Sequence, residues 1–200
     1  MRHRRASSGG SEVRVIGGNW RGRKIRFAAH DGLRPTGDRV RETLFNWLGP
    51  HLRGSRCLDL FAGSGALGIE ALSRGALHCD FIEQDLGAAR TLEQNLIALD
   101  AVQHASVHKA DALEWLAGAR EGWDIVFIDP PFSAALGLPS LEALAGRGLL
   151  RDGGHVYFET SRSSPEPIPT AHYDTFREKT AGDVLFRLLR LAHRDNHPAS

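Results

Sequence analysis

The sequence of 200 residues predicts an α/β fold with a doubly wound, mostly parallel sheet. From residue 56 onward, short apolar runs alternate with segments of helical periodicity, which is the pattern of successive βα units. The glycine-rich segment DLFAGSGALG overlaps the end of the first of these strands and leads into the first helix. Two strand-like runs around residues 181–183 end the pattern, and they predict a C-terminal antiparallel hairpin.

The N-terminal part divides into a tail, residues 1–12, and a small extension, residues 13–54. The tail is rich in Arg, Ser and Gly, which predicts a basic segment that stays disordered until it binds a partner. Apolar residues recur in 13–18 and 24–27 on either side of GGNWRGR, which predicts a β-hairpin. The segment RPTGDRVRETLFNWLG then predicts a helix that stops at Gly49-Pro50.

The main domain is predicted to span residues 55–194. Its strands before the C-terminal hairpin are predicted at residues 57–61, 79–83, 105–109, 125–129 and 155–159. Its helices are predicted at residues 65–75, 86–99, 112–119 and 138–145. The repeated order of strand and helix is typical of parallel strands joined by crossover helices.

Composition excludes several classes of protein. No apolar run approaches the ~18 residues that cross a bilayer, and the basic N-terminus MRHRRASSGG has no apolar stretch behind it, so it is not a secretory signal. Cys57 and Cys79 each begin an apolar run, and we interpret both as buried thiols in a reducing compartment. Metal-ligand spacing is absent from the sequence. These features predict a cytoplasmic protein without a membrane segment or a bound metal.

Charge is distributed unevenly, although the formal net charge is only +1. Residues 1–56 hold 13 Lys and Arg against 4 Asp and Glu, whereas residues 57–200 hold 12 against 20. A basic head on an acidic body indicates a polyanionic partner for the head. A solvated basic tail without a ligand explains the same charges, and composition does not separate the two.

Gly63, Gly65 and Gly68 have G-x-G-x-x-G spacing between a predicted strand and a predicted helix. Glycines there allow a tight turn and let a ligand approach the backbone near a helix N-terminus. Glu83 ends the next strand, where a carboxylate accepts hydrogen bonds from ribose hydroxyls, and Asp111 follows the third strand, in reach of an adenine amino group. Together they predict a nucleoside site, which would also suit a nicotinamide dinucleotide; ordinary loop acids are the alternative.

Asp59 lies inside the first strand of the main domain, between Leu58 and Leu60, where an isolated charge is costly to bury. It either braces the glycine loop or faces the amino group of a bound amino-acid moiety. The second option favours S-adenosylmethionine (SAM) over NAD, because the carboxylate would repel the pyrophosphate of NAD. Phe61, at the end of the same run, is assigned to the same cofactor site.

The run IVFIDPPF, residues 125–132, predicts a buried strand that ends in an acid, two prolines and an aromatic ring. The prolines end the strand because neither has an N–H to donate to a neighbouring strand. A turn that opens with Asp-Pro explains these residues equally well when they are considered alone.

DLFAGSGALG, Glu83 and DPPF together resemble the class I SAM-dependent methyltransferases, and DPPF resembles the branch that methylates exocyclic amino groups of bases. The match is most specific in VIGGNWRGRKI, RPTGDRVRETLFNWL, CLDLFAGSGALGIEALSRGA, DIVFIDPPF and REKTAGDVLFRLLR. Over residues 13–191 the chain is similar to the RsmD-type bacterial 16S rRNA (guanine-N2)-methyltransferases.

This resemblance implies a seven-stranded Rossmann-like sheet, with SAM bound at the glycine loop and S-adenosyl-L-homocysteine as the product. It implies that the substrate is a guanine of 16S rRNA, within the 30S subunit or an assembly intermediate. The N-terminal hairpin and helix would handle the substrate and form a lid over the cofactor. We expect a monomer.

We hypothesise that Asp129, Pro130 and Phe132 are the catalytic residues. An exocyclic amine of guanine is a poor nucleophile, because its lone pair is conjugated into the ring. The Asp129 carboxylate and the Pro130 carbonyl would accept hydrogen bonds from the tetrahedral amine of the transition state, and Phe132 would stack on the flipped-out base. Asp129 either orients the amine or also receives its proton.

The basic head is predicted to contact RNA phosphates, with one aromatic ring available for stacking. The predicted RNA-contacting residues are Trp20, Arg21, Arg23, Lys24 and Arg39, with Arg2, Arg4, Arg5 and Arg26 as further phosphate contacts. For Arg39 and its helix neighbour Arg41, a plain solvated face is an equal explanation, because Asp38 and Glu42 flank them.

Three other functions fit part of the sequence. An NAD-dependent oxidoreductase fits the glycine loop and Glu83, but leaves DPPF, Asp59 and the C-terminal hairpin unexplained. A non-enzymatic rRNA-binding assembly factor fits the basic head, but has no use for an intact DPPF. An adenine-N6 methyltransferase shares the chemistry of DPPF, although the chain has no obvious room for a separate domain that reads DNA sequence.

Overall fold

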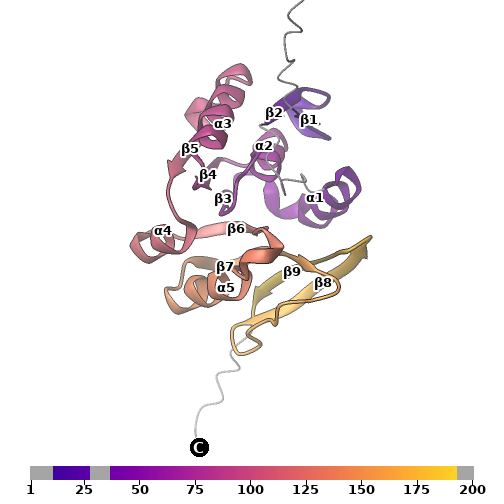
Figure 1. The fold of residues 1–200 in the computed structure, drawn as a ribbon, viewed down its shortest axis with the longest axis vertical. Coiled ribbons are helices and arrows are strands. Elements are labelled where there is room, and N and C mark those ends of the chain that lie inside the picture. Colours follow the sequence, from indigo (N-terminus) through magenta and orange to yellow (C-terminus); the bar gives the residue numbers. More distant parts are fainter. Residues whose placement is uncertain (1–10, 28–36, 193–200) are drawn as a thin grey trace, which may run out of the picture.

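The computed structural model describes residues 11–27 and 37–192. Most of the predicted basic tail, and the last two residues of the predicted main domain, lie outside these ranges. The described part consists of one large sheet with helices on both faces and a two-stranded hairpin beside it (Figure 1).

The large sheet has seven strands in the order β5-β4-β3-β6-β7-β9-β8. The first five strands are parallel to one another, and β9 runs antiparallel to both of its neighbours, β7 and the edge strand β8. The strands are β3 (Arg56–Asp59), β4 (His78–Glu83), β5 (Ala105–Lys109), β6 (Trp123–Ile128), β7 (Leu150–Ser161), β8 (Tyr173–Ala181) and β9 (Val184–Leu191). The predicted fold, with its seven-stranded sheet and C-terminal antiparallel hairpin, is confirmed.

Each face of the sheet carries its own apolar core. Helices α1, α2 and α3 lie over one face and α4 and α5 over the other (Figure 1). The helices are α1 (Asp38–Leu52), α2 (Ala66–Ser73), α3 (Leu86–Ala98), α4 (Ala112–Gly118) and α5 (Gly137–Gly146), with short 3-10 turns at Gly18–Trp20, Val102–His104 and Phe132–Ala134. Side chains alternate between the faces along each strand, so that Phe127 and Tyr157 belong to the first core and Val126 and Val156 to the second.

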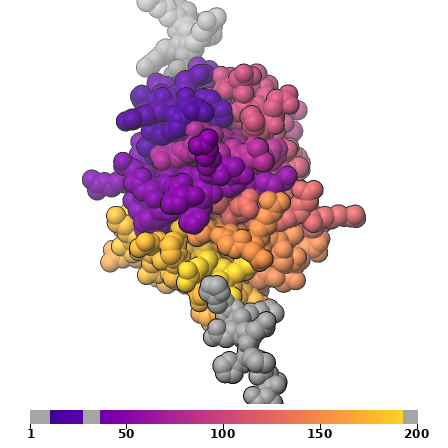
Figure 2. All heavy atoms as spheres, turned by 180° about the vertical axis from the view of Figure 1, so that it is seen from behind, coloured from indigo at the N-terminus to yellow at the C-terminus, as the bar shows by residue number. Residues whose placement is uncertain are grey.

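The N-terminal hairpin joins β1 (Ser11–Arg14) to β2 (Lys24–Phe27) in antiparallel register. Its first strand begins at Ser11, two residues earlier than the predicted start of the extension, because Ser11 pairs with Phe27. The hairpin, in indigo, lies directly against α3 (Figure 2), where the side chain of Asn95 exchanges two hydrogen bonds with the backbone of Arg26.

A buried carboxylate on α2 holds the segment that follows β1. Glu70 is fully buried and accepts hydrogen bonds from the backbone N–H groups of Ile16 and Gly17, at 2.7 and 2.8 Å. Arg74 donates to the same carboxylate at 2.7 Å. The hairpin is therefore tied to the helix that follows the glycine loop, although more than 50 residues separate the two in the chain.

Arg41 does not lie on a solvated face, so that interpretation of this residue is wrong. Its side chain is fully buried, donates to the Arg14 carbonyl at 2.8 Å and pairs with Asp38 at 2.7 Å. Its second terminal nitrogen lies 3.7 Å from Glu70. Arg41 is buried because the hairpin covers this part of α1 and supplies a carbonyl to it, a long-range contact that no local pattern indicates.

Helix α1 continues past Gly49-Pro50 to Leu52, so the predicted stop is also wrong. Proline inside a helix removes one backbone hydrogen bond and crowds the preceding turn. The last turn nevertheless buries Leu52, which is 2% exposed, and burying this leucine helps to offset that cost.

Both cysteines are free and buried, as predicted. Within residues 11–27 and 37–192, no helix has the length and apolar character needed to span a membrane.

Candidate functional site

A cavity of about 1060 Å³ opens at the carboxyl ends of the parallel strands. It contains nine of the residues predicted to form the cofactor and catalytic sites or to contact RNA. These residues are Arg39, Asp59, Phe61, Gly63, Glu83, Asp111, Asp129, Pro130 and Phe132. Doubly wound folds bind ligands outside the carboxyl ends of their strands, and this cavity has that position.

The glycine loop connects β3 to α2 in a conformation that glycine favours. Gly63 and Gly65 have φ angles of +50° and +76°. A Cβ atom on Gly65 would lie 2.3 Å from a methyl carbon of Leu92, and one on Gly68 would lie 2.2 Å from the ring of Phe81. Gly63 lines the cavity, whereas Gly65 and Gly68 do not; their role in this structure is close packing of α2 against its neighbours.

Glu83 ends β4 and braces the glycine loop. Its carboxylate accepts a hydrogen bond from the Gly63 N–H at 2.7 Å and another from the Asp85 N–H at 2.7 Å. A bond between positions 20 residues apart fixes the loop against the neighbouring strand. Glu83 also lines the cavity, so it can support the loop and face a ligand.

Asp111 caps the N-terminus of α4. One of its carboxylate oxygens accepts from the Leu113 and Glu114 N–H groups, at 2.9 and 3.0 Å. This is an ordinary structural role for an acid at a helix start. Because Asp111 also lines the cavity, the cap holds its carboxylate at the rim.

Asp59 is 2% exposed and accepts a hydrogen bond from the Gly68 N–H at 3.0 Å. Burial, together with the nearby charges of Asp129 and Glu83, raises the pKa of Asp59 to about 8, against the lowering effect of that hydrogen bond. Asp59 therefore braces the helix that follows the glycine loop, and it lines the cavity as well.

Asp129, Pro130 and Phe132 follow directly after β6 at the mouth of the cavity. Pro130 is buried, whereas the Phe132 ring is 46% exposed. The turn interpretation also applies, because the Ala134 N–H donates to the Pro131 carbonyl at 2.9 Å and starts a 3-10 turn. The segment is thus a turn that places a carboxylate and an accessible ring at the same opening.

Glu159, near the end of β7, is a site residue that we did not identify from the sequence. It is 5% exposed, lines the cavity and accepts a hydrogen bond from the hydroxyl of the buried Tyr157. Burial, together with the charge of Asp129, raises the pKa of Glu159 to about 8. The signal was present in HVYFE, where an acid ends an apolar strand in the same way as Asp129 ends IVFID.

The predicted RNA-contacting residues are dispersed. Arg2, Arg4 and Arg5 lie outside the described residues. Among the predicted contacts that the structure describes, only Arg39 lines the cavity; Trp20 packs partly buried against the core beside α2. Arg23 donates to the Ala98 carbonyl at 2.7 Å, and Lys24 pairs with Glu12 at 2.7 Å. Arg21 is exposed.

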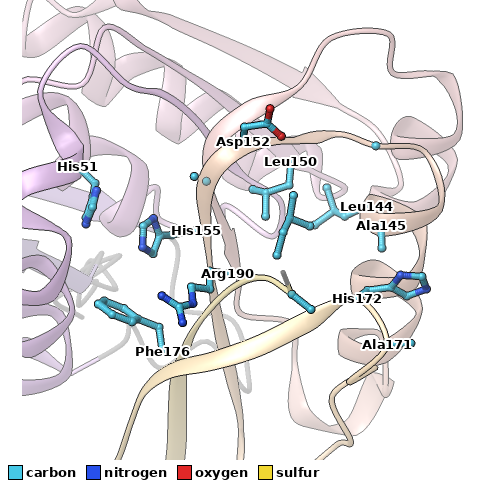
Figure 3. Close-up of a pocket in the computed structure, with 15 residues that line it drawn as sticks. His51, Leu144, Ala145, Leu150, Asp152, His155, Ala171, His172, Phe176 and Arg190 are labelled. Atoms are coloured by element: carbon cyan, nitrogen blue, oxygen red, sulfur yellow. The ribbon is translucent and has the colours of Figure 1, made fainter. Parts of the chain in front are cut away.

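A second cavity, of about 690 Å³, lies at the opposite end of the sheet, where β7 begins (Figure 3). The rings of His51 and His155 are 4.3 Å apart, and the guanidinium of Arg190 lies 5.4 Å from the ring of Phe176. Burial, together with the neighbouring His51 and Arg190, lowers the pKa of His155 to about 4. Within the described residues, the buried Nδ1 of His155 has no hydrogen-bond partner.

Comparison with known proteins gives concordant matches over nearly the whole chain. The family described as conserved hypothetical protein 95 matches residues 13–190. The ribosomal RNA small subunit methyltransferase D of Escherichia coli K12 is 45% identical over 90% of this chain and 91% of its own length. The protein of the same name from Haemophilus influenzae is 43% identical over 88% of this chain and 93% of its own length.

Solved structures share the fold. An Escherichia coli structure, provisionally named methyltransferase yhhF, has a TM-score of 0.82 and 44% identity, and the match covers 90% of this chain and 98% of that one. A more distant structure, SMU.776, has a TM-score of 0.68 at 13% identity, and the match covers 94% of this chain and 57% of that one. It is provisionally described as a methyltransferase in complex with S-adenosyl-L-homocysteine, and at this identity the likeness concerns the fold alone.

Proposed function

Because the chain belongs to the family described as conserved hypothetical protein 95, we propose that it transfers a methyl group from SAM to the exocyclic N2 of a guanine in 16S rRNA. The relatives named methyltransferases, at 43% and 45% identity over nearly the whole chain, support methyl transfer, and the choice of guanine N2 is the finer part of the proposal. We further propose a monomer that acts in the cytoplasm on the 30S subunit or an assembly intermediate.

One observation carries the proposal. The Asp129 carboxylate and the accessible Phe132 ring lie at the mouth of the same cavity that contains the glycine loop. A base that stacks on Phe132 would present its amino group toward Asp129, within the space that a nucleoside cofactor shares.

The residues of the cavity fit SAM. Gly63 leaves its backbone open to the ligand, Glu83 lies where a ribose would bind, and Asp111 lies at the rim beside the adenine position. Phe61 supplies apolar surface, and the buried Asp59 supplies a carboxyl group for the cationic amino-acid end. When bound, SAM supplies an activated methyl group on a positively charged sulfur.

The chain's own residues supply orientation and hydrogen-bond acceptors. The Asp129 carboxylate and the Pro130 carbonyl would accept hydrogen bonds from the amine as it becomes tetrahedral, which stabilises the transition state more than the ground state. Two consecutive prolines restrict the backbone at this point, so the Pro130 carbonyl keeps its direction before substrate binds. Asp129 would orient the amine, and as a carboxylate it could also accept the proton that the amine loses.

The RNA partner is proposed from charge and position. Arg39 lines the cavity and Arg21 is exposed on the hairpin, and these two are the best placed of the predicted contacts. The proposed contacts of Trp20, Arg23 and Lys24 require these side chains to exchange their present neighbours for RNA.

The test is methyl transfer to small-subunit RNA from a strain that lacks this activity. Purified protein is incubated with SAM carrying a labelled methyl group and with either 30S subunits or free 16S rRNA. The expected product is N2-methylguanine at one position, identified by nuclease digestion and mass spectrometry. Label in N6-methyladenine, or no label in either RNA, would overturn the proposal.

A further inference from the structure

We propose that Glu159 selects guanine, by accepting a hydrogen bond from the N1–H of the base whose N2 amine faces Asp129. This inference rests on the proposed transfer to guanine N2 and assigns a specificity-determining residue within that site.

The sheet places the two carboxyl groups side by side. Strands β6 and β7 are adjacent and parallel, and Ile128 pairs with Phe158. Asp129 and Glu159 are therefore at the same level on strands about 4.8 Å apart. Phe127 and Tyr157, two positions earlier, both point into the first core.

Because side chains alternate, Asp129 and Glu159 face the same side of the sheet as those two rings. Both residues line the same cavity. Two acceptors at one level, on one face, form a pair that a flat ligand edge can span.

Tyr157 fixes the orientation of the Glu159 carboxyl group. Its hydroxyl donates to Oε2, so that oxygen serves as an acceptor. No described residue donates to Oε1, which is therefore available to a ligand in the cavity. At 5% exposure the group is nearly removed from water, so a correct hydrogen bond counts strongly and a mismatched one is costly.

The pair matches the edge of guanine and not that of adenine. Guanine carries two neighbouring donors, N1–H and the N2 amine, whereas adenine carries an amine next to an unprotonated N1 acceptor. An ionised Glu159 would accept from N1–H of guanine and would repel N1 of adenine. A base with two donors also relieves the repulsion between the two neighbouring carboxylates.

Protonation of Glu159 would reverse this preference, because a protonated carboxyl group donates. Burial and the neighbouring Asp129 raise the pKa of Glu159 to about 8. The hydroxyl of Tyr157 also contacts Glu159. Asp59 lies close enough to Asp129 that the charge of Asp129 raises the pKa of Asp59. The discrimination should therefore strengthen as the pH rises through 8.

The test compares two RNAs that differ in one base. Once the target is mapped, small-subunit RNA is ligated with either guanine or 2-aminopurine at that position. 2-Aminopurine keeps the N2 amine but has an acceptor at N1. Above pH 8, where Glu159 is ionised, we expect wild-type kcat/KM to be about 100-fold higher for guanine, because one mismatched contact to a base costs about 1–3 kcal/mol.

In Glu159→Gln the amide can donate to N1 of 2-aminopurine, so the ratio should fall to within about 5-fold. Glu142→Gln, on the exposed side of α5, is the matched control and should keep the wild-type ratio. An unchanged ratio in Glu159→Gln would overturn the inference. If wild-type enzyme methylates neither RNA, the proposed function itself fails, so the two failures are distinguishable.

A second experiment uses only the wild-type enzyme. The wild-type ratio of kcat/KM between the two RNAs is measured from pH 6.5 to pH 9. It should rise about tenfold, since ionised Glu159 is the form that distinguishes N1–H from a bare N1. A ratio that is flat across this range would refute the role of Glu159 even if the substituted protein does not fold.

Discussion

The two ends of the same sheet bury titratable groups of opposite kind. At the carboxyl ends of the strands, Asp59, Asp129 and Glu159 line the larger cavity, and burial raises the pKa of Asp59 and of Glu159 to about 8. At the opposite end, burial lowers the pKa of His155 to about 4, beside Arg190. In both places burial favours the neutral form.

The difference lies in what surrounds the buried group. The carboxyl groups face a cavity that also contains the glycine loop, so a ligand with donors or positive charge can stabilise their ionised forms. His155 lies at a tilt to the ring of His51 and edge-on to Phe176, with the positive Arg190 nearby, so its neutral form is stable without a ligand (Figure 3). A shifted pKa therefore indicates a reactive site only where the cavity offers a matching ligand.

Removing the acid at the mouth of the larger cavity should have the largest effect. Asp129→Asn should lower methyl transfer about 10³-fold, because an amide holds the developing charge on the amine poorly. SAM binding, measured by calorimetry, should change little. Asp152→Asn, at the opposite cavity, is the matched control and should retain full activity. Near-normal turnover by Asp129→Asn would remove that residue from the chemistry.

Glu83→Gln should act on binding and not on chemistry. The carboxylate holds the Gly63 N–H and lies at the ribose position, so its loss should weaken SAM binding about 30-fold, or about 2 kcal/mol. Isothermal calorimetry measures the dissociation constant directly. Glu93→Gln, on the exposed face of α3, should bind SAM as the wild type does. An unchanged constant in Glu83→Gln would exclude Glu83 from the cofactor site.

The free energy of unfolding should fall with rising pH because of the buried acids Asp59 and Glu159 at the carboxyl ends of the strands. The raised pKa values of Asp59 and Glu159 mean that the folded chain keeps protons that the unfolded chain releases. The stabilisation is complete below about pH 4 and is lost as the pH rises through 8. Between pH 5 and pH 8 the Glu159→Gln protein should lose about 1–2 kcal/mol less of its free energy of unfolding than the wild type, measured by urea unfolding. An identical pH slope in both proteins would contradict the raised pKa.

His155, at the opposite end of the sheet, should have a smaller effect on the free energy of unfolding, and this effect should have the opposite dependence on pH. Because the pKa of His155 is lowered to about 4, the unfolded chain binds a proton first as the pH falls. Its contribution is complete above about pH 6.5 and is lost toward pH 4. His155→Phe keeps an aromatic ring at this position. It should reduce the loss of stability at pH 5 by about 1 kcal/mol. The expected difference is this small because solvent around His51 and Arg190 screens the charge.

Unfolding midpoints of wild type and His155→Phe at pH 5 and pH 7.5 test this prediction. His104→Phe, at an exposed position, is the control. If His155→Phe and His104→Phe both lose as much free energy of unfolding on acidification as the wild type, the pKa of His155 is not lowered in the folded chain.

Features that depend on nearby residues were predictable. The alternation of strands and helices, the glycine spacing and the position of Glu83 after the second strand all follow from local patterns. Ends of elements were less predictable: β7 begins at Leu150, five residues before its predicted start, because Leu150 pairs with Trp123 of β6. Tertiary contacts set such boundaries, and a local window does not contain them.

The order of elements, the position of Asp129 directly after its strand and the place of the glycine loop were thus contained in the sequence, because each is a property of a short segment. Tertiary structure alone decided that Glu159 lies beside Asp129, 30 residues away in the chain, and that Tyr157 orients it. It also decided that Arg41 is buried under the hairpin. The physical reason is that burial, and the pKa shifts that follow from it, depend on which strands become neighbours.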